Sequence, residues 1–342
     1  MSRLLSPKVL VPTAIIILAF VVVNLLQVRV VLPDISIPAE TVLELFGFKI
    51  TNTLLSAWFT MLLLIVGTWL ITRRMKLVPG RWQSFLEMIV EALYGLVENA
   101  AGPKWAPRFF PIVATIFLFV LVGNWLGLTP LFGGWGVLHE AHEGEGYPVD
   151  WVNDSHTLGF WVRGEEAPLE EAAAEAAGAE EHGELYLLAP MFRAPSTDMN
   201  FTLALAIVSV LLTQYFGVRG LGAGYFGKFI ALGGIVNAFR KPGLGCGGRI
   251  AAFFMGIIDV FLGIVETISE IGKVVSFSFR LFGNIFAGEV LLGVMAFLIP
   301  FVVSLPFFGL ELFVGFVQAL VFMMLTVAFF VVAISSHGEE HS

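Results

Sequence analysis

Cysteine is almost absent from this 342-residue chain, in which Cys246 is the single cysteine. One cysteine excludes an intrachain disulfide and any metal site built from several thiolates. Four of the six histidines are scattered among carboxylates in one segment, at His139, His142, His156 and His182. Their spacing does not match that of a zinc site. We therefore expect neither a metal ion nor a cofactor.

Charge is scarce as well. Charged residues make up 13% of the chain and hydrophobic residues 57%, whereas an ordinary soluble domain is about 25% charged. This composition predicts an all-α polytopic membrane protein embedded in a lipid bilayer. The net charge is −8, and we expect no nucleic-acid partner. Because ionisable side chains are costly inside a membrane, those within the spans become the candidates for function.

The negative charge is concentrated in one segment. Residues 131–190 contain thirteen acidic residues and one basic residue, which leaves 14 acidic and 18 basic residues in the rest of the chain. The stretch LEEAAAEAAGAEEHGE within this segment is of low complexity and could form a solvated helix. The pattern predicts an acidic loop outside the membrane, attached to a mildly basic membrane body.

Long apolar runs predict about six membrane helices, since about 20 apolar residues span a bilayer. The runs are residues 9–31, 54–72, 109–130, 201–218, 250–298 and 301–333. A cleaved signal peptide is the alternative for the first run. The basic cluster after the second run, Arg73, Arg74, Lys76 and Arg81, indicates the cytoplasmic side.

These patterns divide the chain into five parts. The first is 1–51, with one helix and an outer segment; the second is 52–131, with two membrane helices and an interfacial helix between them. The acidic loop 132–197 follows, then 198–249, with a membrane helix and a basic connection. The last part, 250–342, is expected to form a long helical hairpin. A straight helix over 250–298 would be roughly 75 Å long, so it must break, bend or tilt strongly.

One arginine lies in the middle of this hairpin. The stretch SFSFRLFGNIFAGEV, residues 276–290, places Arg280 in apolar sequence, with Asn284 one turn later and Glu289 beyond it. An arginine inside hydrocarbon costs at least about 3 kcal/mol on insertion scales. A structural ion pair or a side chain reaching the interface is the alternative, but apolar sequence on both sides disfavours the latter. We interpret Arg280 as a functional residue.

Other charges on the same helix form a stripe that leads to Arg280. At about 100° per residue the members of the stripe fall within an arc of roughly 80°: Asp259, Glu266, Glu270, Lys273 and Arg280. Glu270 and Lys273, three residues apart, could instead form a simple ion pair. Glu289 lies nine residues beyond Arg280, roughly 180° around an ideal helix. The carboxylate of Glu289 and the guanidinium of Arg280 are therefore expected to face different surroundings.

The motif RLFGN followed by AGE closely resembles subunit a of F-type ATP synthases, and the similarity runs from about Asn52 to the C-terminus. The resemblance implies a tilted terminal hairpin beside a rotating c-ring. It also implies that Gln318, in LFVGFVQAL, packs against Arg280, and that Glu311 stands where some relatives have a histidine partnered with an acid matched here by Glu289. Asp198 matches an acid at the mouth of an outer channel, although it could equally cap a helix.

The function implied by the resemblance is proton translocation without bond chemistry. Protons would enter near Asp198, pass Glu311 and Glu289, and protonate a carboxylate of the c-subunit ring; they would leave along Glu270 and Glu266. Arg280, with Asn284 and Gln318 beside it, would keep the two half-channels apart. The implied partners are the c-ring, the peripheral-stalk b subunits and the remaining ATP synthase complex. The implied location is a bacterial plasma membrane, with the acidic loop outside and the C-terminus in the cytoplasm.

A self-contained secondary transporter or channel is the alternative function. Such proteins usually carry internal repeats, and we find no convincing repeat here. The sequence leaves open whether the transported ion is H⁺ or Na⁺.

Overall fold

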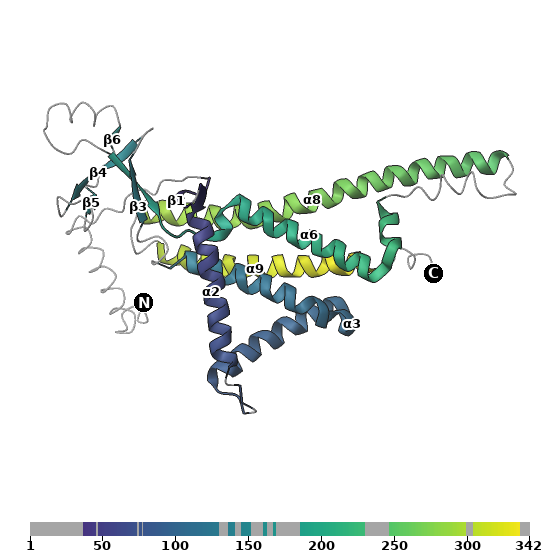
Figure 1. Ribbon diagram of the computed structural model, residues 1–342, viewed down its shortest axis with the longest axis horizontal. Coiled ribbons are helices and arrows are strands. Elements are labelled where there is room, and N and C mark those ends of the chain that lie inside the picture. Colours follow the sequence, from purple (N-terminus) through teal and green to yellow (C-terminus); the bar gives the residue numbers. More distant parts are fainter. Residues whose placement is uncertain are drawn as a thin grey trace, which may run out of the picture. The chain divides into compact units, whose positions relative to one another are not determined.

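Five long helices make up most of the described chain (Figure 1). The computed structural model describes residues 37–45, 47–73, 75–76, 78–129, 136–140, 145–151, 160–162, 167–168, 185–229, 246–298 and 304–335. The helices are α2 (Asn52–Thr72), α3 (Arg81–Gly127), α6 (Met199–Leu221), α8 (Cys246–Leu298) and α9 (Ser304–Ile334). Among the described residues, α2, α3, α6 and α9 are long and apolar enough to cross a membrane. The prediction of an all-α polytopic membrane protein is confirmed, whereas the predicted first span, residues 9–31, lies outside the described residues.

A β-hairpin that the sequence analysis did not predict leads into α2. Strands β1 (Thr41–Leu45) and β2 (Phe48–Thr51) pair antiparallel, and Gly47 makes the turn with φ 83°. A positive φ costs glycine almost nothing because it has no Cβ. Helix α2 then begins at Asn52, directly after β2.

Helix α3 combines the predicted interfacial helix with the predicted third span. Gly102 interrupts it with φ 74° and ψ 163°, and Pro103 follows at once. This region of backbone conformation is essentially restricted to glycine, and a proline fits the first turn of the helix that follows. The two predicted helices are therefore joined at a kink.

Short strands occupy the described parts of the acidic loop. They are β3 (Gly136–Glu140), β4 (Glu145–Trp151), β5 (Phe160–Val162), β6 (Ala167–Pro168) and β7 (Leu185–Pro190). They form an antiparallel sheet of order β3-β7-β4-β5, with β6 paired to β4. The stretch predicted to form a solvated helix lies outside the described residues.

The chain divides into two compact units, each built from segments distant in sequence. The first unit comprises the described parts of Met1–Ala57, Asn124–Pro195 and Ile285–Val314; the second comprises those of Trp58–Gly123, Ser196–Asn284 and Gly315–Ser342. In the second unit, Phe109, Phe216 and Phe330 join α3, α6 and α9, with ring centroids 4.8 to 5.1 Å apart. The five-part division made from the sequence stays a prediction.

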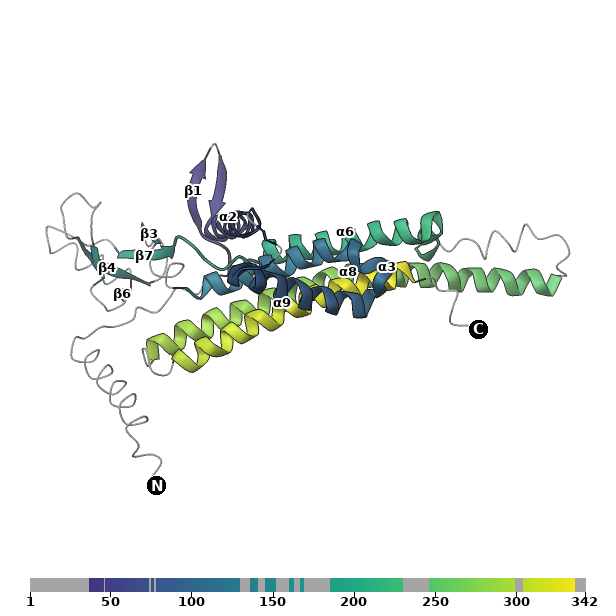
Figure 2. The ribbon, with the colours of Figure 1, turned by 90° about the horizontal axis from the view of Figure 1, so that it is seen from below.

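Helices α8 and α9 form the predicted hairpin and run side by side (Figure 2). Phe277 on α8 packs on Phe322 with ring centroids 4.0 Å apart, and Asn284 bonds Gln318. The partner number on α9 falls as the number on α8 rises, so the two helices are antiparallel. Helix α8 is continuous over 53 residues. Of the three possibilities raised by its length, a break is therefore excluded. Helix α8 begins at Cys246, the single cysteine of the chain.

Candidate functional site

The residues singled out from the sequence are divided between the two units. Glu289 and Glu311 belong to the first unit. The second unit contains the remaining candidates: Asp198, Glu266, Glu270, Arg280, Asn284 and Gln318.

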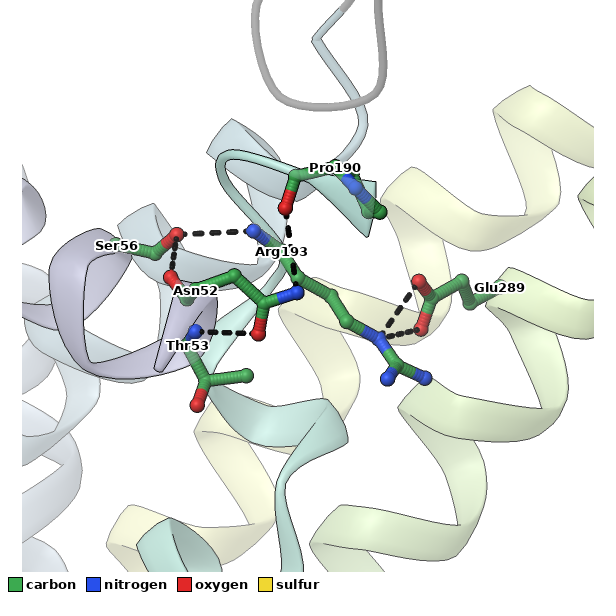
Figure 3. A network of polar contacts seen from close by, with 6 residues as sticks. All are labelled: Asn52, Thr53, Ser56, Pro190, Arg193 and Glu289. Carbon is green, nitrogen blue, oxygen red and sulfur yellow. Dashed lines mark hydrogen bonds and ion pairs between the residues drawn. The ribbon is translucent and has the colours of Figure 1, made fainter. Parts of the chain in front are cut away.

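In the first unit, Glu289 forms an ion pair with Arg193, a residue that the sequence analysis missed (Figure 3). The Nε–H of Arg193 donates to both carboxylate oxygens of Glu289, at 3.0 and 3.1 Å. The Arg193 side chain is 8% exposed and that of Glu289 is 42% exposed. The guanidinium also lies 5.7 Å from the ring centroid of Phe286, one turn earlier on α8. The arginine is thus buried, and the carboxylate that it binds reaches the surface of the unit.

The backbone around Arg193 is held by the first turn of α2 (Figure 3). The Arg193 N–H donates to Ser56 Oγ at 3.0 Å, and Ser56 Oγ donates to the Asn52 carbonyl at 2.9 Å. Asn52 Nδ2 donates to the Pro190 carbonyl at 3.3 Å, at the end of β7. Asn52 and Ser56 lie four residues apart and so share one helix face. One face of α2 therefore fixes both ends of the segment 190–193.

Glu311 on α9 is buried, with 7% of its surface exposed. Its carboxyl group lies directly against Gly288 of α8, where a Cβ atom would overlap it. Because Gly288 precedes Glu289, the two candidate carboxylates of this unit, Glu289 and Glu311, come from adjacent parts of the hairpin.

In the second unit, Arg280 is exposed and makes no hydrogen bond or ion pair with the residues that the structure describes. One turn later, Asn284 Nδ2 donates to Gln318 Oε1 at 2.7 Å. Gln318 is 4% exposed, and its Nε2 has no partner in the described part of the chain. In the described part of the chain, the motif thus places a bonded amide pair one turn from a cation that has no hydrogen bond or ion pair.

Glu270 is neutralised within the second unit. Lys273 Nζ donates to Glu270 Oε1 at 2.7 Å, so the simple ion pair considered as the alternative is formed. Gln214 Nε2 donates to Glu270 Oε2 at 3.2 Å, and the Tyr225 hydroxyl donates to Gln214 Oε1 at 2.7 Å. Gln214 and Tyr225 were not found from the sequence. Glu266, one turn earlier on α8, is partly buried.

Asp198 is the N-cap of α6, as one of its two sequence interpretations predicted. Its Oδ1 accepts the Asn200 N–H at 2.8 Å, and its backbone is extended. The next turn is tied to α8, because the hydroxyls of Thr202 and Ser278 lie 3.0 Å apart and share a hydrogen bond. In the described residues, no group of three or more histidine, cysteine, aspartate or glutamate side chains could hold a metal ion.

Comparison with known proteins agrees with the sequence motif. The family model described as ATP synthase A chain matches residues 54–331. The chain is 29% identical over 290 residues to "ATP synthase subunit a" of Gloeobacter violaceus, covering 85% of this chain and 86% of the relative. It is 27% identical to the protein of the same name from Moorella thermoacetica, covering 88% of this chain and 98% of the relative. The chloroplastic subunit a of Stigeoclonium helveticum is also 27% identical, over 89% of this chain and 93% of the relative. The chain therefore belongs to the ATP synthase A chain family, whose members are non-catalytic subunits of the Fo membrane sector.

Proposed function

We propose that this chain is the stator half of a proton path, with Arg280 separating two half-channels that lead to and from a c-subunit ring. The observation that carries the proposal is the state of Arg280, which is exposed on α8 and bonded to no described residue. A guanidinium keeps its charge at every physiological pH. A cation left unpaired on a membrane helix needs a partner, because an isolated charge in hydrocarbon is costly.

The nearest acidic residues of α8 do not supply that partner. Glu270 is bonded to Lys273, and Glu289 is bonded to Arg193. The charge of Arg280 is therefore left for a carboxylate on another subunit, which its attraction holds in the ionised form. A ring carboxylate that reaches Arg280 would release its proton, and it could not carry that proton past the arginine.

The remaining candidates supply the two sides of the path. Glu311 and Glu289, with Asp198, would serve the outer half-channel, since a carboxyl group can accept and release protons. Glu270 and Glu266 would serve the inner half-channel. Each proton that moves down a potential of 100 mV releases about 2.3 kcal/mol. Rotation of the ring would transmit that free energy to the catalytic subunits.

This function requires several partners and one orientation. The c-ring would lie along α8 and α9, and peripheral-stalk b subunits would hold the chain against it. The plasma membrane would carry the complex, with the acidic loop on the outer side and the C-terminus in the cytoplasm. The basic residues that follow α2, Arg73, Lys76 and Arg81, support this orientation.

The test is ATP-driven acidification of membrane vesicles that carry the assembled complex. We expect Arg280→Ala to abolish acidification while the complex stays assembled. Arg219→Ala is the matched control, because Arg219 is also an exposed arginine and bonds only Tyr215 in the described chain; this variant should pump like the unmodified complex. Undiminished pumping by Arg280→Ala would overturn the proposal and leave Arg280 as a structural residue.

A further inference from the structure

We infer that Arg193 is a positioning residue for Glu289, which holds this carboxylate in place along the outer half-channel. The inference rests on the proposed function. It concerns a residue from the irregular segment between β7 and α6, 96 positions away from its partner in the sequence.

The geometry of the ion pair favours positioning over simple neutralisation. One Nε–H group contacts both oxygens of Glu289 almost equally, at 3.0 and 3.1 Å, which centres the carboxylate on that nitrogen. A carboxylate offers about four lone-pair sites. The pair with Nε–H therefore fixes the carboxylate without occupying all of them. With 42% of its side chain exposed, Glu289 can still reach water or a neighbouring group.

The arginine is itself anchored, which a positioning role requires. Its side chain is 8% exposed, so it has little freedom to follow a moving carboxylate. Its backbone N–H is bonded to Ser56, and Asn52 bonds the carbonyl of Pro190 three residues earlier. The ring of Phe286 lies near the guanidinium on the side of α8. The location of the Glu289 carboxylate is thus set by α2 and the end of β7, as well as by its own helix.

The decisive experiment is a double-mutant cycle on ATP-driven acidification by the assembled complex. Arg193→Gln keeps a polar side chain and removes the cation; Glu289→Asp keeps a carboxylate and withdraws it by one methylene. We expect Arg193→Gln to slow pumping by about tenfold or more, because a misplaced acid–base group loses part of the 10²–10⁴-fold that such groups contribute. In the Glu289→Asp background the same change should cost far less, since the carboxylate has already left its position.

Two further variants distinguish a positioning role from general destabilisation: one replaces Arg193 by another cation, and one removes the hydroxyl that bonds its backbone. Arg193→Lys should recover most of the pumping, because an ammonium can still bond Glu289. Ser56→Ala removes the acceptor of the Arg193 N–H and should slow pumping in the same direction, whereas Ser56→Thr keeps the hydroxyl and should not. If Arg193→Gln does not assemble, the cycle is run with Ser56→Ala and Glu289→Asp, because Ser56→Ala weakens the anchor of Arg193 and leaves its side chain in place.

Each outcome has a definite meaning. The positioning role is overturned if Arg193→Gln pumps normally. It is also overturned if the fold-reductions in pumping rate of the two single variants multiply in the double variant. Both results leave the proposed function intact as long as Arg280→Ala abolishes pumping. If Arg280→Ala pumps normally, the proposed function itself fails, and Arg193 and Glu289 are then a structural ion pair whose variants show no coupling in pumping.

Discussion

At the scale of single residues, Gly288 matters because the carboxyl group of Glu311 occupies the space of its missing side chain. We predict that Gly288→Ala slows ATP-driven pumping without destabilising the chain. Alanine is about 0.8–1 kcal/mol more favourable than glycine in a helix, so α8 itself should gain stability. The added methyl group, however, must push the Glu311 carboxyl group away from α8. Acidification by vesicles and thermal stability of the assembled complex measure the two effects.

Gly309→Ala provides the matched control for this prediction. Gly309 also lies on the hairpin, two residues before Glu311. In the described chain, no atom apart from its chain neighbours and the backbone of its own helix turn lies within 4 Å of the position that its Cβ would take. This variant should gain helix stability and keep normal pumping. Equal pumping by the two variants would mean that the packing of Glu311 on α8 has no part in proton transfer.

Residue type and spacing reveal Arg280, Asn284 and the Glu270–Lys273 pair, because all of them follow from the periodicity of one helix. Arg193 could not be found in this way. It lies outside any helix, and its partner Glu289 is reached only through tertiary structure. The available signal was its place in FRAPSTDMN, a charged residue shortly before the cap residue Asp198. Gln214 was missed because uncharged polar residues in apolar helices are common and are often structural. Tyr225 was missed because it lies beyond the end of α6, in the glycine-rich segment GAGYFGK, where no periodic pattern marks it.

At the scale of elements, Asp198 has two roles to separate: it caps α6, and in the proposed function it lies at the outer half-channel. We predict that the two roles separate in the variants Asp198→Asn and Asp198→Ala. Asparagine caps a helix about as well as aspartate, whereas alanine costs about 1 kcal/mol. Thermal stability should therefore fall for Asp198→Ala and stay nearly unchanged for Asp198→Asn. If the carboxylate conducts protons, both variants should slow pumping, since neither retains an ionisable group.

Normal pumping by Asp198→Asn would reduce Asp198 to its structural role, already visible in its bond to the Asn200 N–H. The outer path would then begin at Glu311 and Glu289, in the other unit. A stability loss of the same size in both variants would instead show that the charge, and not the cap, holds the start of α6.

The helices could be predicted from apolar runs and their basic ends, whereas the strands could not. The sequence predicts only an outer segment where the structure has the β1–β2 hairpin, although the two stretches TVLEL and FKIT flank a glycine, as the strands of a hairpin do. The strands of the acidic loop are short and lie among acidic and glycine residues, so the composition hides their alternation. The kink of α3 had a local signal in Gly102-Pro103, and the sequence analysis placed a helix on each side of it.

At the scale of the whole molecule, the proposed transport depends on orientation, since the two proposed half-channels must open on opposite sides of one membrane. Helix α2 has 21 residues and is roughly 31 Å long, about the thickness of the hydrocarbon layer. Phe48 precedes it and is 79% exposed; Val78 follows it and is 82% exposed. These two positions therefore report on the two ends of one span.

The single cysteine makes the orientation measurable. In a Cys246→Ser background, we predict that a membrane-impermeant maleimide labels Phe48→Cys only in right-side-out vesicles and Val78→Cys only in inverted vesicles. The Cys246→Ser parent should remain unlabelled in both. The reason is electrostatic, because Arg73, Lys76 and Arg81 follow α2 and basic loops stay on the cytoplasmic side. The opposite labelling pattern would place the β1–β2 hairpin in the cytoplasm. Glu289, which Arg193 holds in place, would then serve the inner half-channel. The proposed direction of proton flow through Glu289 would be reversed.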